Sequence, residues 1–275
     1  AYMIDAVPER MRARALSSLG GSHRIGLFVG PLIGAAVIAR WGIGGPFVLA
    51  CVAALGAAGL ALTIPDVGAQ HRAQRSERLS VLAVLAAHRH VLLTLGTSVM
   101  VISATRGIRG TLLPLWADHV GLSAQDTSLI FGIAAAVDMA LFYPAGWVMD
   151  RFGRVWIAVP CVAVMAIGFT LLPSATGFAA VTAVAVLIAV GNGIGSGIVM
   201  TLAADSAPVQ GRAQFLGAWR LCGDVGNTAG PFLVSALAAL ATLGAACVLT
   251  GGISLAGAAW SGYWVARLDL SLIHI

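Results

Sequence analysis

The chain has 275 residues, of which 59% are hydrophobic and only 10% are charged. Soluble domains carry about 25% charged residues, so this composition excludes a protein with a fully water-facing surface. The net charge is +5, and every basic residue is an arginine. These arginines lie in short links between apolar runs, which favours a membrane topology over nucleic-acid binding. Arginine without lysine, with abundant Ala and Gly, is typical of a GC-rich bacterial genome.

Eight apolar segments are long enough to cross a bilayer, which takes about 20 residues of helix. We therefore predict an all-α membrane protein with about eight transmembrane helices. In chain order the segments are His23–Ala39, Gly45–Ile64, Val91–Trp116, Ala124–Val148, Val155–Leu172, Phe178–Ala203, Gln214–Leu240 and Leu243–Ala266.

The arginines between these segments predict which side faces the cytoplasm. Thirteen fall on one side and only Arg40 on the other, so the positive-inside rule makes the crowded side cytoplasmic. The C-terminus is then cytoplasmic, and the protein is expected in the inner membrane of a bacterium. The thirteen are Arg10, Arg12, Arg14, Arg24, Arg72, Arg75, Arg78, Arg89, Arg151, Arg154, Arg212, Arg220 and Arg267.

The start of the chain resembles its end when the sequence is shifted by 200 residues. Eight identities fall within 27 positions, where this composition gives roughly three by chance. Each copy holds a loop followed by a helix with the pattern G-x-x-x-G-P. Two similar halves are typical of secondary transporters. The matched pairs are Asp5/Asp205, Pro8/Pro208, Arg12/Arg212, Ala13/Ala213, Leu16/Leu216, Gly26/Gly226, Gly30/Gly230 and Pro31/Pro231.

A charged turn joins the fourth and fifth apolar segments. Its pattern G-x-x-x-D-R-x-G-R resembles the signature loop of the major facilitator superfamily, a cytoplasmic link between adjacent helices. The residues that carry it are Gly146, Asp150, Arg151, Gly153 and Arg154.

Two further segments resemble the drug–proton antiporters of that superfamily. Residues 26–35 resemble the antiporter motif of family helix 5, except that Ala35 replaces its last glycine. Residues 106–123, with Leu113-Pro-Leu-Trp116, resemble family helix 7. Small residues spaced by four allow close helix packing, and ordinary packing is the alternative interpretation. The motif positions are Gly26, Gly30, Pro31 and Gly34.

The resemblance implies an N-terminally truncated chain that runs from the end of family helix 4 through helix 12. Residues 1–65 would be the remainder of the N-terminal bundle, and 66–90 the central cytoplasmic link. Residues 91–267 would form the C-terminal six-helix bundle, with 268–275 as a tail. The last six residues read as a sequencing-library adapter, so we expect them to be foreign to the protein.

The resemblance also implies a conformational switch in the signature loop. Gly146 would let neighbouring helices approach, and Asp150 would lie near the N-terminus of the helix at 23–39 and near Arg212. Arg151 and Arg154 would bind carbonyls, lipid phosphates or acidic partners. Such a cluster would stabilise the outward-facing state. The alternative is a plain positive-inside turn.

Charges within apolar segments are candidate functional residues, because they are costly at membrane depth. Arg106 lies 15 residues before the turn at Gly121, and Asp138 lies 17 after it, so we expect these two residues at one depth. A buried ion pair would be either purely structural or part of the transport path, with Arg109 beside it. Asp138, if it faced the cavity instead, could exchange a proton in each cycle.

A second group lies in the seventh apolar segment. Arg220 and Asp224 are four residues apart, with Asn227 one turn deeper. Arginine before aspartate is the weaker order for a pair within a helix, so partners elsewhere are expected, with Arg24 as one candidate for Asp224.

No pattern for a metal, cofactor or enzyme active site stands out in the sequence. The glycine-rich run at 191–197 follows no strand, so close helix packing explains it better than phosphate binding.

We therefore expect a secondary transporter that works by alternating access, with proton-coupled efflux of small amphipathic compounds as its function. The partners expected are the substrate, protons and the lipid bilayer, with no nucleic acid and a monomeric state. A superfamily importer of a sugar or metabolite is the first alternative. A non-transporting remnant is the second.

Overall fold

A computed structural model describes residues 12–63, 81–208 and 210–273. These residues are helical apart from short connections, and they include no strand. The predicted all-α fold is therefore confirmed. The start of the first repeat copy and most of the central link lie outside the described residues.

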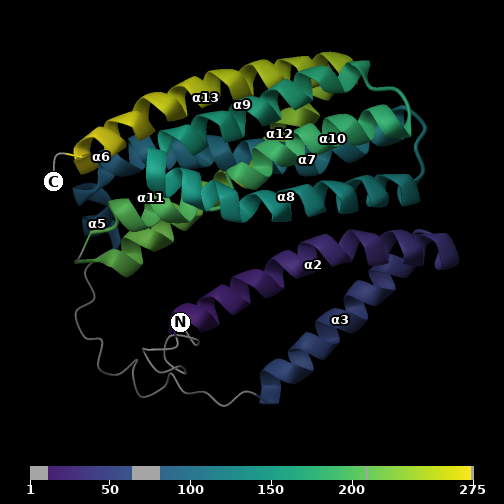
Figure 1. The fold of residues 1–275 in the computed structure, drawn as a ribbon, viewed down its shortest axis with the longest axis horizontal. Helices are drawn as coiled ribbons and strands as arrows, with labels where there is room; N and C mark the ends of the chain where they lie inside the picture. Colours follow the sequence, from purple (N-terminus) through teal and green to yellow (C-terminus); the bar gives the residue numbers. More distant parts are fainter. Residues whose placement is uncertain (1–11, 64–80, 209, 274–275) are drawn as a thin grey trace. The chain divides into compact units, whose positions relative to one another are not determined.

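Helices occur at all eight predicted segments (Figure 1). Short helical turns precede α7 and follow α9. The longer helices are α2 (Arg12–Trp41), α3 (Gly44–Thr63), α7 (Thr97–His119), α8 (Ala124–Phe152), α9 (Val155–Leu171), α10 (Phe178–Ile194), α11 (Ile198–Ser206), α12 (Arg212–Leu240) and α13 (Leu243–Ile273).

Six of the described helical segments are long and apolar enough to cross a membrane. The other two predicted spans correspond to α2 and α12. Helix α2 contains a shorter apolar stretch, Phe28–Trp41, and α12 carries Arg220 and Asp224 along its length. Their crossing of the bilayer stays a prediction.

The chain divides into two compact units. Of the described residues, the first unit comprises 12–63 and 124–132, and the second comprises 81–123, 133–208 and 210–273. In the first unit, α2 and α3 form a hairpin that turns at Gly42, whose φ of +70° suits glycine because it has no side chain to clash. The predicted division at residues 65 and 90 stays a prediction.

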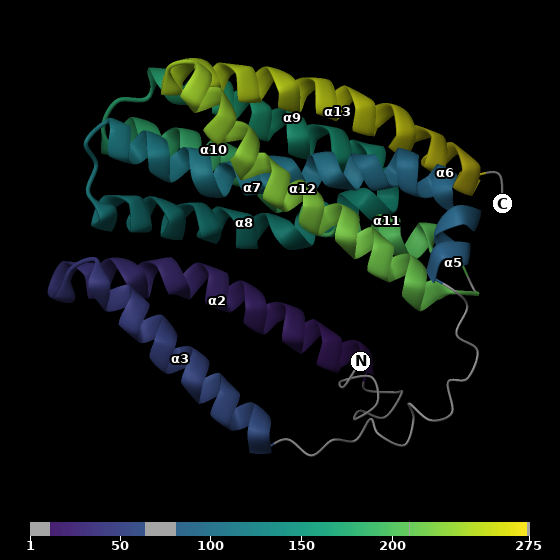
Figure 2. The same ribbon diagram turned by 180° about the vertical axis from the view of Figure 1, so that it is seen from behind.

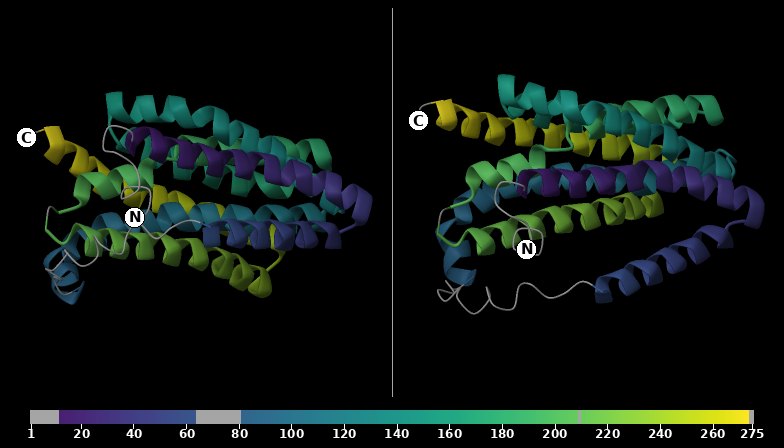
Figure 3. Two further views of the ribbon diagram at one scale, coloured as in Figure 1. Left: turned by 90° about the horizontal axis from the view of Figure 1, so that it is seen from below. Right: turned by 60° about the horizontal axis from the view of Figure 1, so that its bottom comes forward.

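The second unit is a helical bundle (Figures 1 and 2). Helix α7 lies against α12 and α13, and α9 lies against α10 and α13. Figure 3 shows α7 and α12 side by side along much of their length. A short helix before α7, α5 (Val81–Ala87), contacts α12 within the region predicted as a polar link.

The predicted span at 178–203 is interrupted in the structure. Helix α10 ends at Ile194 and α11 begins at Ile198, with a turn over Gly195–Gly197 between them. Glycine is the poorest helix former after proline, which explains why the helix breaks in the glycine-rich run. Hydropathy predicted one continuous helix here, because it does not detect such a break.

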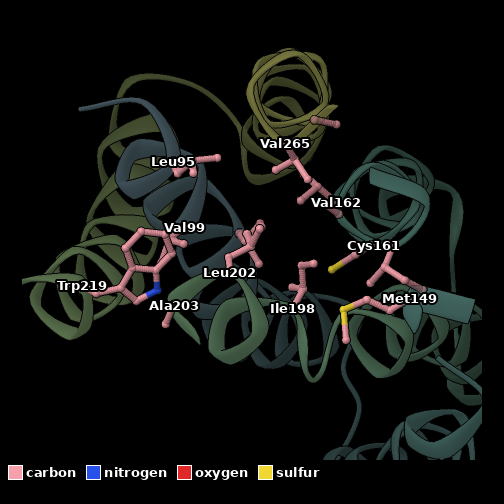
Figure 4. Close-up of a cluster of buried hydrophobic side chains, with 14 of the residues drawn as sticks. Leu95, Val99, Met149, Cys161, Val162, Ile198, Leu202, Ala203, Trp219 and Val265 are labelled. Atoms are coloured by element: carbon pink, nitrogen blue, oxygen red, sulfur yellow. The ribbon is translucent and has the colours of Figure 1, made fainter. Parts of the chain in front are cut away.

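The core of the second unit is a cluster of apolar side chains from most of its helices. Figure 4 shows Val162 of α9 facing Val265 of α13, with Cys161 and Ile198 nearby. All four are fully shielded from solvent. In lipid such contacts stabilise through close packing, because moving an apolar group from lipid to protein gains little.

The internal repeat has a structural counterpart. Pro31 lies inside α2 and Pro231 inside α12, at the predicted offset of 200 residues. In each copy a second helix follows after a short turn, α3 from Gly44 and α13 from Leu243. The two copies therefore fold alike at the level of their helices.

Candidate transport site

The buried charge cluster consists of Arg106, Arg109, Asp138 and Asn192, contributed by α7, α8 and α10. Arg109 Nη1 donates to Asp138 Oδ2 at 2.6 Å, and the two side chains are 11% and 17% exposed. Asn192 Nδ2 donates to the same oxygen at 3.0 Å. An arginine and an amide thus share one carboxylate oxygen within the helical bundle.

Arg109, not Arg106, is the partner of Asp138, which corrects the pairing expected from the sequence. Counted from the turn at Gly121, Arg109 and Asp138 differ by five residues, or about 7 Å along a helix at about 1.5 Å per residue. Helical side chains lean toward the N-terminus of their own helix. Because α7 and α8 run antiparallel, the Arg109 side chain leans away from the turn at Gly121 and the Asp138 side chain leans toward it. The two side chains therefore approach each other. Counting Cα positions alone overlooks this.

The glycine-rich run brings α10 close to its neighbours. A Cβ added to Gly193 would lie 3.0 Å from the Cα of Asp138 in α8. At Gly191 it would lie 2.9 Å from the carbonyl oxygen of Cys161 in α9. The expected role of this run in close helix packing is confirmed. Asn192, between these glycines, is thereby held within reach of Asp138.

Asn192 was not among the residues predicted for the site. The sequence feature that could have identified Asn192 is an amide flanked by glycines inside an apolar span, in the same bundle as the carboxylate of Asp138. Nothing in the sequence indicated which face of the helix the amide occupies.

Arg106 lies at the break between α10 and α11. Its Nη2 donates a hydrogen bond to the carbonyl oxygen of Gly195, in the turn between the two helices. In transporters, interrupted helices commonly supply backbone groups to substrate and ion sites. The turn between α10 and α11 therefore places a backbone carbonyl, that of Gly195, beside the buried charge cluster.

The hydrogen bonding of the buried charge cluster is incomplete within the described part of the chain. Three of its polar atoms are buried and have no hydrogen-bonding partner there. They are Asp138 Oδ1, Arg106 Nε and Arg109 Nε. Unsatisfied polar atoms in a buried site are costly and often mark a functional position.

The signature-loop cluster consists of Asp150, Gly153, Arg154, Asp205 and Asp269. Arg154 Nε donates to Asp205 Oδ2, at the end of α11, at 2.9 Å. This hydrogen bond raises the pKa of the Arg154 guanidinium above its ordinary value, and Asp269 and Asp150 add to the effect. Of the partners expected for Arg154, the structure shows an acidic one.

Asp269 fixes the turn from the side of α13. Its Oδ2 accepts a hydrogen bond from the Val155 N–H at 2.9 Å, at the first residue of α9. A carboxylate is favourable there because the N-terminus of a helix is positive. Gly153 has φ +101°, and a Cβ on it would lie 2.8 Å from the same oxygen. Only glycine fits this position without strain.

The expected surroundings of Asp150 stay a prediction. The residue is exposed, and no ion pair joins it to Arg212 among the described residues. The helix at 23–39 belongs to the other unit. A Cβ on Gly146 would meet no atom within 4 Å, so its close helix contact also stays a prediction. Arg151 lies 5.5 Å over the Trp147 ring.

The second copy of the glycine motif joins α12 to α7. A Cβ on Gly226 would collide with the Met100 carbonyl, and one on Gly230 with the Ala104 carbonyl. Gly107 of α7 makes the reciprocal contact. A Cβ on Gly107 would collide with the carbonyl of Asn227 in α12 and lie 3.1 Å from Pro231 Cδ. In the first copy, by contrast, no atom of the described residues lies within 4 Å of a Cβ on Gly26, Gly30 or Gly34.

Arg220 and Asp224 pair with each other, and the expected pairing of Asp224 with Arg24 stays a prediction. Their Nε and Oδ1 atoms lie 3.1 Å apart, and the side chains are 78% and 60% exposed. An exposed pair one turn apart contributes little to stability. Asn227 is also exposed, and the side chain of Arg24 lies outside the described residues.

Within the described residues no three His, Cys, Asp or Glu side chains lie close enough together to hold a metal ion. The cysteines at 51, 161, 222 and 247 are all free.

Long apolar helices, a charge cluster within their bundle and a charged turn at one end define a polytopic membrane protein. A family model described as Major Facilitator Superfamily matches residues 1–231 and 95–270, which together cover nearly all of the chain. The chain therefore belongs to the Major Facilitator Superfamily. It is a secondary transporter of small molecules and not an enzyme. Among curated proteins no match was found.

Proposed function

We propose that the protein exports small amphipathic compounds in exchange for protons, by alternating access. The observation that carries this proposal is the position of Asp138. Its carboxylate lies in the bundle, next to an interrupted helix, with one oxygen unpartnered among the described residues. Ionisable groups at membrane depth commonly serve as proton relays.

The arrangement provides two states for Asp138. As a carboxylate it holds Arg109 and Asn192 through a single oxygen. When it binds a proton, the attraction to Arg109 is lost and the arginine can rotate toward other acceptors. A proton would thereby change the contacts between α7, α8 and α10, which is what coupling requires.

The signature-loop cluster supplies the second part of the proposal. Arg154 and Asp269 anchor the turn within its own bundle, while Asp150 and Arg151 remain exposed. In our proposal these exposed charges contact the other bundle in the outward-facing state and separate from it on inward opening. The anchored half of the turn keeps Asp150 in place for this contact.

The distribution of charge supports an inner-membrane location with the C-terminus in the cytoplasm. The turn that carries Arg154 is bonded to α13 through Val155 and Asp269, and Arg267 on α13 lies 4.4 Å over the Tyr263 ring. Arginines with aromatic neighbours are typical of the cytoplasmic interface of a membrane protein.

Proton coupling is testable in liposomes that contain the purified protein. With an acidic lumen, an antiporter accumulates dye as protons leave, and we expect this for ethidium or carboxyfluorescein. D138N should lower gradient-driven accumulation at least about tenfold, because it cannot release a proton, and should retain exchange without a gradient. D138E should keep part of the coupling.

D118N is the matched control, because it makes the same substitution at an exposed residue at the outer end of α7. Normal coupling in D138N would contradict the role of Asp138. Accumulation only with an acidic exterior would indicate symport and favour the importer alternative. Absence of any dye movement in either direction would favour the non-transporting remnant.

A further inference from the structure

We propose that the buried charge cluster binds the anionic group of the substrate, a carboxylate or a similar anion, with Arg106 as its principal contact. This inference deepens the proposed function, since it assigns a chemical class to the compound transported. It rests on the charge balance of the cluster and on the hydrogen bonds its members leave unmade.

The cluster carries one more positive charge than negative. Arg106 and Arg109 face a single carboxylate, Asp138. Other described ionised groups of the second unit lie at its helix ends or, like Arg220 and Asp224, pair with each other at an exposed position. An uncompensated charge within a bundle is costly, so a ligand that supplies the missing negative charge would be stabilised there.

The hydrogen bonds assign this excess charge to Arg106. Arg109 is neutralised by Asp138 at 2.6 Å. The hydrogen-bonding partners of Arg106 among the described residues are neutral, the Gly195 carbonyl and the Cys161 sulfur, and its buried Nε has no partner there. A guanidinium with free donors matches the geometry of a carboxylate.

The same arrangement disfavours a cation. A cation approaching the free Oδ1 of Asp138 would also approach two guanidinium groups. The carboxylate already interacts with Arg109 and Asn192 through its other oxygen. Arg106 itself is only partly buried and lies beside the break between α10 and α11. An anion that binds to Arg106 therefore need not break the pair between Arg109 and Asp138.

Equilibrium dialysis of the purified chain in detergent tests this inference with benzoate and benzamide, which share a shape and differ in charge. We expect benzoate to bind at least about tenfold more tightly, since hydrogen bonds to charged groups contribute about 1.5–3 kcal/mol. R106Q should abolish this preference, whereas R106K, which keeps the charge but not the planar guanidinium, should keep part of it. The control R89Q, at an exposed position before α7, should bind as the parent does.

Two other measurements complete the test. Competition by chloride distinguishes an inorganic anion site, where chloride displaces benzoate at similar concentration, from an organic carboxylate site, where it does not. D138N should bind benzoate more tightly, because it removes the competing negative charge. Equal binding of benzoate and benzamide, or an R106Q protein that is folded and keeps the preference, would overturn the inference.

Failure of this inference is separable from failure of the proposed function. Binding in detergent needs no proton gradient, so anion binding without gradient-driven transport would leave only the export proposal wrong. Conversely, gradient-driven transport of ethidium but not carboxyfluorescein, with no preference for benzoate, would leave only the anion site wrong.

Discussion

The ion pair between Arg154 and Asp205 links the signature loop to the end of α11. Both side chains are about one-fifth exposed, at 24% and 19%, so the pair is only partly screened by water. Arg220 and Asp224 make a contact of similar length but at 78% and 60% exposure. The pair between Arg154 and Asp205 should therefore stabilise the fold more than the pair between Arg220 and Asp224, since solvent weakens exposed pairs.

We predict that a double-mutant cycle separates these two pairs. R154Q and D205N should show a coupling free energy of about 1–2 kcal/mol, as expected for a partly buried charged hydrogen bond. R220Q and D224N, the matched control within α12, should show about 0.3–0.5 kcal/mol. The measurement is the free energy of unfolding of each variant in detergent. Equal coupling in both cycles would show that the Arg154–Asp205 pair does not fix the loop.

The residue types at the site could be predicted from the sequence better than their pairing could. Charges inside apolar runs single out Arg106, Arg109 and Asp138, because each is expensive in lipid. Their hydrogen bonds depend on the direction in which each side chain leans, which sequence spacing does not give. Asp269 could not be predicted as a partner of Val155, because the two are 114 residues apart.

The contact between α7 and α12 shows what the second copy of the glycine motif does. Gly226 and Gly230 of α12 face carbonyls of α7, and Gly107 of α7 faces α12. Small residues on both helices bring the two backbones together, which is the usual basis of tight helix association in membranes. In α12 the glycine motif therefore serves to pack this helix against α7.

We predict that alanine at Gly226 destabilises the bundle, while alanine at Gly217 in the same helix does not. The Cβ of G226A would collide with the Met100 carbonyl, and relief of such overpacking costs about 1–3 kcal/mol. Gly217 has no atom within 4 Å of a Cβ, so G217A should be neutral or up to about 1 kcal/mol stabilising through helix propensity. Thermal unfolding in detergent measures both.

A G226A protein as stable as the parent would show that α7 and α12 can separate without cost, contrary to the close contact described here. A loss of stability in G217A would indicate that its exposed face meets a partner in the folded protein.

At the scale of helices, sequence periodicity and hydropathy predicted nearly everything. All eight apolar segments are helical, and the shift of 200 residues aligns Pro31 inside α2 with Pro231 inside α12. The sequence did not predict the break at Gly195–Gly197, or the short helix α5 within the polar link. Both depend on neighbouring helices, whereas hydropathy reports only on the segment itself.

For the molecule as a whole, we predict a cytoplasmic C-terminus. The turn after α8 and the end of α13 meet through Asp269, so they lie on the same side of the membrane. A fluorescent protein fused after α13 should fluoresce in cells, because it matures in the cytoplasm, and alkaline phosphatase fused there should be inactive. Fusions in the turn between α12 and α13 should show the reverse pattern. Active phosphatase at the C-terminus would invert the proposed orientation.

The short helix α11 has a mechanical consequence. Arg106 holds the turn that precedes it, and Arg154 holds Asp205 near its other end. Its residues Ile198–Ser206 span about 13 Å at about 1.5 Å per residue. A helix of that length, joined to α10 through a turn with two glycines, would move as one piece if it rotated about that turn. We expect a ligand that draws Arg106 away from Gly195 to shift the far end of α11, and with it the turn that holds Arg154.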